Sequence, residues 1–127
     1  MRKIISRYVA AMVFLCSSFV QASAQNRASP MPFQGGKAIY EGLCQGCHMH
    51  DAKGAVGAGM YPALANDSKL EVAGYPIAVI VHGQKAMPAL GGYLDDRQVA
   101  DVVNYIRSHY GNNYKDEAKP EDVKTQR

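Results

Sequence analysis

Hydrophobic residues recur every three or four positions towards the C-terminal end of the chain, which is the spacing of one helix face. Asp95 is placed to cap the first turn, Gln98 follows it three positions later, and Gly111 suits the end of the helix. The segment is therefore predicted to be an amphipathic helix. The residues on its apolar face are Val99, Val102, Val103, Ile106 and Tyr110.

Two earlier segments show the same spacing. Gly35 to Cys47 is predicted to form a helix, and a second helix has Pro76 in its first turn and Gly83 at its end. A short helical turn over 69–73 is expected between them, capped by one of residues 66–68. The apolar side chains of 77–81 are assigned to the core rather than to a partner-binding stripe.

Glycines separate these helices, and Gly54, Gly57 and Gly59 indicate a loop. Their order differs from the dinucleotide-binding fingerprint, and no strand is predicted before them. No segment alternates apolar and polar residues, so no strand is expected anywhere in the chain. The predicted fold class is all-α.

The N-terminal residues have the pattern of a secretory signal peptide. Arg2, Lys3 and Arg7 precede an apolar run over 8–20 that is too short to span a bilayer, and Ala-Ser-Ala at 22–24 offers a cleavage site. Residues 1–24 are predicted to be removed on export to the periplasm, leaving no stable membrane insertion. A retained anchor is the alternative, and a lipoprotein signal at Cys16 is disfavoured because Phe-Leu precedes it.

Removal of the signal changes the charge. The chain has 14 Lys and Arg residues against 11 Asp and Glu residues. Three of the basic residues lie in the signal, so eleven basic and eleven acidic residues remain and the net charge is zero. No basic surface for nucleic acid is expected.

The remaining chain divides into three parts. Residues 25–35 are predicted to be a flexible leader, 36–111 a single domain and 112–127 a charged tail. The tail contains Pro120 and has no core pattern. It either lies along a partner or is a solvated, disordered end.

Cys44-Gln45-Gly46-Cys47-His48 carries the chemistry of the chain. On one helical turn, two thiols can reach vinyl groups of a porphyrin while the imidazole ligates its iron. A redox dithiol would need a βαβ setting, and a structural zinc site would need a second ligand pair. Covalent haem c, attached through Cys44 and Cys47 with His48 as iron ligand, is the leading interpretation.

An electron-transfer haem normally has a second axial ligand. Met87 is favoured because Pro88 fixes an extended backbone beside it, which would help present the thioether sulfur. Met60 and His82 are the alternatives. A Met opposite a His raises the reduction potential of the iron and favours electron transfer over oxygen chemistry.

With these residues the chain resembles the class I cytochromes c. The resemblance covers nearly all of 36–111. It depends on Gly36, Tyr40 and the haem motif at the start, Met87-Pro88 in the middle, and residues 101–107 at the end. It implies helices wrapped around the haem, a close crossing of Gly36 and Tyr40 with Val102 and Tyr105, and a Pro62 carbonyl that accepts a hydrogen bond from the haem histidine.

The chain has no Trp, so contacts to the haem propionates would fall to Tyr61, Tyr75 or Tyr93, each of which is otherwise ordinary packing. The Tyr61-Pro62 loop and the Met87-Pro88 loop look most like small monohaem cytochromes that serve bacterial periplasmic dehydrogenases. The resemblance implies an electron carrier rather than an enzyme, with a dehydrogenase as donor and a cytochrome or terminal oxidase of the respiratory chain as acceptor. A tightly bound dehydrogenase subunit, and an enzyme or gas sensor with an open haem position, are the alternatives.

Overall fold

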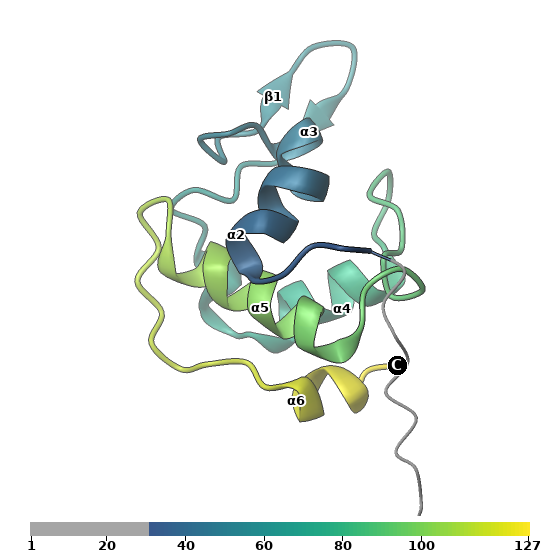
Figure 1. Cartoon of the computed structure of the whole chain (residues 1–127). Helices are drawn as coiled ribbons and strands as arrows, with labels where there is room; N and C mark the ends of the chain where they lie inside the picture. The colour runs from purple at the N-terminus through teal and green to yellow at the C-terminus, as the bar shows by residue number, and fades with distance from the viewer. Residues whose placement is uncertain (1–30) are drawn as a thin grey trace, which may run out of the picture.

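A computed structural model describes residues 31–127, so the predicted signal peptide and residues 25–30 of the leader lie outside the described part. Figure 1 shows helices packed around α5, with a small hairpin projecting beyond α3. No helix within 31–127 is long and apolar enough to cross a membrane. The elements are α2 (Gly36–Ile39), η1 (Tyr40–Cys44), α3 (Gln45–His48), β1 (Ala55–Val56), β2 (Met60–Tyr61), η2 (Ser68–Glu71), α4 (Gly74–His82), α5 (Asp96–Ser108) and α6 (Pro120–Lys124).

The first predicted helix is present, but it is not uniform. It runs from Gly36 to His48, and its middle segment, η1, has the wider π-helical turn. Gly36 allows this helix to cross α5 closely, because a Cβ atom there would lie 2.1 Å from the Asp101 carbonyl oxygen and 2.5 Å from the Tyr105 Cβ. The close crossing that the resemblance implies is therefore possible because residue 36 is a glycine and has no side chain.

The fold is mostly helical, as expected, but the expectation of no strand is wrong. Ala55 pairs with Tyr61 and Val56 with Met60 in an antiparallel hairpin, within the predicted glycine loop. The Gly57 amide donates to the Gly59 carbonyl over 2.8 Å and closes the turn. Strands of two residues are too short to show an alternating pattern, so no periodicity predicts them.

The central helices lie close to their predicted positions. The short turn is a 3₁₀-helix at Ser68–Glu71, one residue earlier than expected, and the Asp67 side chain accepts from the Lys69 amide over 3.0 Å. In α4, Pro76 lies in the first turn and Gly83, with φ 75°, follows the last residue. Ile77, Ile80 and Val81 are buried, which supports their assignment to the core.

The helix α5 has the predicted capping box. The Asp95 carboxylate accepts from the Gln98 amide over 2.8 Å, and the Gln98 side chain accepts from the Asp95 amide over 3.2 Å. The helix ends at Ser108, before the predicted stop at Gly111, because His109 (φ −123°, ψ 176°) already has an extended backbone. The buried apolar face is the predicted one up to Ile106.

The tail, 112–127, is neither disordered nor free. It continues along α5 and forms α6 (Figure 1). The side chains of Ala118 and Val123 are buried in the core. Asn104 on α5 and Ala118 exchange two hydrogen bonds of 2.9 and 2.8 Å. The interpretation as a solvated end is therefore wrong, since the tail closes the core on one side of α5.

Part of the predicted flexible leader is also ordered. The Gln98 side-chain amide donates to the carbonyl oxygens of Met31 and Phe33 over 3.0 and 2.8 Å. The Phe33 ring packs on Gly42, where a Cβ would lie 2.4 Å from the ring. Residues 31–35 are thus tied to both the first helix and α5.

Candidate haem-attachment site

The three residues of the haem motif lie at the C-terminal end of the first helix. Cys44 is the last residue of η1, and Cys47 and His48 are the last two residues of α3. Cys44 is half-buried and Cys47 is exposed. The motif is set in a helix and lacks the βαβ surroundings of a redox dithiol in the described part of the chain.

His48 is only 8 % exposed, and one of its ring nitrogens is already engaged. Nδ1 lies 2.9 Å from the carbonyl oxygen of Pro62, which is the contact that the resemblance implies. With Nδ1–H donating to this carbonyl, Nε2 keeps its lone pair and is the nitrogen that can bind a metal. The ring is therefore oriented and in the tautomer that an axial ligand needs.

The Pro62 carbonyl is held in place by the loop that carries it. Gly54 has φ 67°, and a Cβ there would lie 2.1 Å from the Tyr61 carbonyl oxygen and 2.7 Å from the Pro62 carbonyl carbon. The Gly54 amide also donates to the His48 carbonyl over 3.1 Å. Only glycine allows the two sides of this loop to approach so closely.

The environment of Cys44 suits a thioether better than a thiolate. Burial, and then the neighbouring charge of Cys47, raise the pKa of the Cys44 thiol to about 12. A thiolate at this position would be costly, whereas a thioether formed with a vinyl group carries no charge and needs no solvation. The donor set of Cys44, Cys47 and His48 thus fits a covalently attached haem.

The three possible sixth ligands differ in their surroundings. Met87 is half-buried against the core, and its backbone exchanges hydrogen bonds of 3.0 and 2.9 Å with Gln84 in a tight turn. Met60 is 73 % exposed on β2, and His82 is exposed at the end of α4. Met87 is the best placed of the three, but its role as a ligand stays a prediction.

The tyrosines proposed for the propionates are all partly exposed: Tyr61, Tyr75 and Tyr93. The Tyr75 hydroxyl donates to the Gln84 side-chain oxygen over 3.3 Å and so braces the turn that carries Met87. The propionate assignments stay predictions.

Two residues shape this region in ways that the sequence does not predict. The Tyr40 side chain is expected only in helix packing, yet its hydroxyl donates to the Met49 carbonyl, next to His48, over 2.8 Å. Arg107 is expected only as part of the terminal motif, yet it is fully buried and joins three segments. A tyrosine one helical turn before the haem motif is a weak signal, and no pattern in the sequence pointed to burial of the arginine.

The family comparison agrees with this geometry. The family model described as "Cytochrome C oxidase, cbb3-type, subunit III" matches residues 32–106. The chain therefore belongs to this family of c-type cytochrome domains, and the fold, the cofactor and electron transfer follow from that membership. Its cofactor is haem c, attached through Cys44 and Cys47.

Individual relatives fall into two groups. The chain is 32 % identical over 114 residues to the fructose dehydrogenase cytochrome subunit of Gluconobacter japonicus, a match covering 76 % of this chain and 23 % of that protein. It is 34 % identical over 108 residues to the gluconate 2-dehydrogenase cytochrome c subunit of Pantoea cypripedii, covering 71 % and 23 %. A cytochrome c6 of Diacronema lutheri is 32 % identical over 80 residues, which is 60 % of this chain and 94 % of that protein. The chain thus spans less than a quarter of each of the two dehydrogenase subunits, whereas its match to the cytochrome c6 covers nearly all of that protein.

Proposed function

We propose that this chain is an exported monohaem cytochrome that accepts single electrons from a periplasmic dehydrogenase and passes them to the respiratory chain through a cytochrome or terminal oxidase. The observation that carries the proposal is the 2.9 Å contact between His48 Nδ1 and the Pro62 carbonyl. It fixes an imidazole for iron at the end of the helix that also holds both thiols. The relatives named as dehydrogenase cytochrome subunits support the choice of donor.

When bound, the haem would supply an iron that changes its charge by one electron. Cys44 and Cys47 would hold the porphyrin, and His48 and Met87 would bind the iron. Since two protein side chains would then bind the iron, no position would be left for a substrate, so we assign the chain electron transfer and no catalytic step.

A tightly bound subunit of a dehydrogenase is the second candidate, and the hairpin favours it. Val56, Met60 and Tyr61 are exposed apolar side chains on β1 and β2. No charged residue lies between Lys53 and Asp67, so this face would bind a partner without ion pairs. Apolar surface of this kind is more typical of permanent than of transient contacts.

The test isolates the protein from the periplasmic fraction of its native cell. A free carrier is expected to purify alone, and a subunit is expected to co-purify in a fixed ratio with a dehydrogenase. In either case the haem absorption should change to that of the reduced form when the dehydrogenase and its substrate are added. Absence from the periplasm, or no reduction by any periplasmic dehydrogenase fraction, would contradict the proposal.

A further inference from the structure

A series of hydrogen bonds connects Tyr40, in the first turn of η1, with the segment whose Pro62 carbonyl orients His48. The Tyr40 ring is fully buried, and its hydroxyl donates to the Met49 carbonyl over 2.8 Å. Burial raises the pKa of Tyr40 above its usual range. The hydroxyl therefore stays protonated, and remains a donor, at any physiological pH.

The turn that this hydroxyl contacts has an unfavourable backbone. Met49 has φ 67° and Ala52 has φ 58°, in the left-handed region that residues with a Cβ seldom adopt. Each such residue destabilises the turn unless its surroundings hold it in place. The Met49 carbonyl accepts a hydrogen bond from the Ala52 amide within the turn, over 3.2 Å, and a second one from the Tyr40 hydroxyl. The turn is therefore stabilised by a contact to the first helix in addition to its own hydrogen bond.

The Met49–Ala52 turn also holds the segment after Pro62 in place. The Ala52 carbonyl accepts from the amides of Leu64 and Ala65 over 2.7 and 2.9 Å. Two residues before Leu64, the Pro62 carbonyl lies 2.9 Å from His48 Nδ1. A displacement of the Met49–Ala52 turn would therefore be transmitted to the contact that orients the imidazole.

We propose that Tyr40 is a positioning residue for the haem iron, whose hydroxyl fixes the Met49–Ala52 turn and thereby the Pro62 carbonyl against His48. This inference rests on the proposed function in taking His48 as the axial ligand. Loss of the hydroxyl should loosen the His48–Pro62 hydrogen bond. A less strongly hydrogen-bonded imidazole is a weaker base and stabilises oxidised iron less, so the reduction potential should rise.

The test compares holoprotein carrying Tyr40→Phe with unsubstituted holoprotein. The substitution keeps the buried ring and removes one oxygen, so the fold should be retained. Tyr105→Phe is the matched control, because the Tyr105 hydroxyl contacts that of Tyr110 over 3.3 Å in the same aromatic cluster and does not contact the Met49 turn. Two quantities are measured: the reduction potential, and the rate at which the His48 Nδ1 proton exchanges with solvent by NMR.

In Tyr40→Phe, exchange of the His48 proton should accelerate at least tenfold, while the amide protons of α5 keep their rates. The relative affinity for oxidised and reduced iron should change about threefold, which corresponds to a rise of about 30 mV for a one-electron couple. Equal values in Tyr40→Phe and the unsubstituted protein would overturn the inference, as would equal shifts in Tyr105→Phe. A missing histidine ligand in the unsubstituted protein would instead overturn the proposed function.

Discussion

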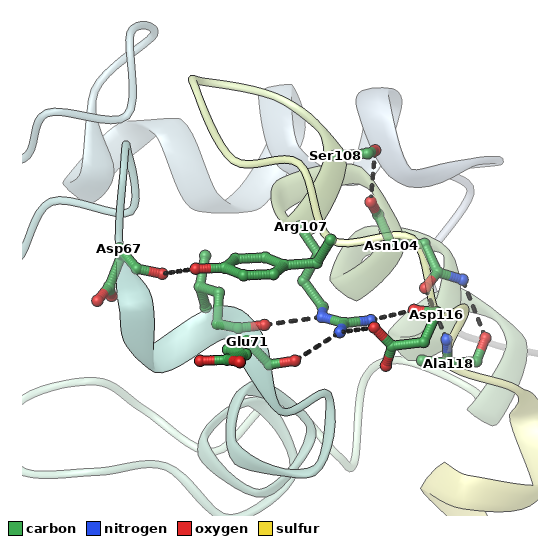
Figure 2. Close-up of polar contacts among 9 residues, drawn as sticks. Asp67, Glu71, Asn104, Arg107, Ser108, Asp116 and Ala118 are labelled. Atoms are coloured by element: carbon green, nitrogen blue, oxygen red, sulfur yellow. Dashed lines mark hydrogen bonds and ion pairs between the residues drawn. The ribbon is translucent and has the colours of Figure 1, made fainter.

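The guanidinium of Arg107 lies 2.7 Å from the carboxylate of Asp116, which joins the last turn of α5 to the C-terminal tail. The arginine is 1 % exposed, whereas the aspartate side chain is 73 % exposed. Arg107 also donates to the carbonyl oxygens of Leu70 and Glu71, each over 2.8 Å (Figure 2). One buried cation thus links α5, η2 and the tail.

Replacing this cation should be strongly destabilising. Arg107→Met leaves buried carbonyl oxygens without a donor and removes the contact to Asp116, so the free energy of unfolding should fall by about 3 kcal/mol. Urea denaturation of the holoprotein measures the change. Arg97→Met is the control, because Arg97 is an exposed residue of the same helix. A loss below about 0.5 kcal/mol in both variants would contradict the role of Arg107.

The Asp116 carboxylate makes part of this stability dependent on pH. Its hydrogen bond from Arg107 holds its pKa below the ordinary value of 3.8. Because the pKa is lowered in the folded state, the stabilisation is fully present above pH 3.8 and is lost as the pH falls through the folded-state pKa. The stability difference between the unsubstituted protein and Asp116→Asn should therefore be constant near neutral pH and shrink in acid. A difference that grows in acid would contradict this assignment.

Buried residues of the C-terminal tail should contribute to the free energy of unfolding as core residues do. Val123 is fully buried in α6, so Val123→Ala should lower the free energy of unfolding by about 2 kcal/mol. The neighbouring Lys124 is exposed, and Lys124→Ala should leave the stability nearly unchanged. Thermal denaturation of the two variants makes the comparison. Identical melting temperatures would indicate that the tail is a solvated or partner-binding segment and not part of the core.

The crossing of the first helix with α5 depends on Gly36. In Gly36→Ala the new Cβ would meet the Asp101 carbonyl at 2.1 Å, so the helices must separate and the stability should fall by about 2 kcal/mol. Gly92→Ala is the control, since a Cβ there has nothing within 4 Å and the residue has no positive φ. It should leave the stability nearly unchanged. Equal denaturation midpoints would show that the crossing tolerates a methyl group.

The identity of the sixth ligand is tested by two methionine substitutions. Met87→Ala should lower the reduction potential and open an iron position that binds carbon monoxide in the reduced protein. Met60→Ala removes an exposed thioether on the hairpin and should change neither property. Absorption spectra with and without carbon monoxide are sufficient. An unchanged reduced spectrum in Met87→Ala would exclude Met87 and direct attention to Met60 or His82.

The helices and the haem motif could be predicted because their signals are local. Asp95 and Gln98 form a capping box within one turn, and Cys44, Cys47 and His48 lie within five consecutive residues. The spacing of apolar residues in α5 reports directly on its buried face. These features need no knowledge of distant contacts.

The tail could not be predicted for the opposite reason. Its burial depends on Arg107, whose partners include backbone carbonyls of η2, and carbonyl oxygens are present at every residue. A charged residue near the end of a helix is normally exposed to solvent, so the sequence predicts an exposed side chain at this position. The Tyr40 hydroxyl was missed in the same way, because its acceptor is the Met49 carbonyl at a turn whose shape the sequence does not specify.

The proposed function depends on one haem that is covalently attached through Cys44 and Cys47 and ligated by His48. This attachment is tested by the mass and absorption spectrum of the denatured protein after periplasmic expression with a cytochrome maturation system. The expected mass is that of the cleaved chain plus one haem, and covalent haem should be lost when both cysteines are replaced by serine. Colourless protein, or a mass without added tetrapyrrole, would contradict it.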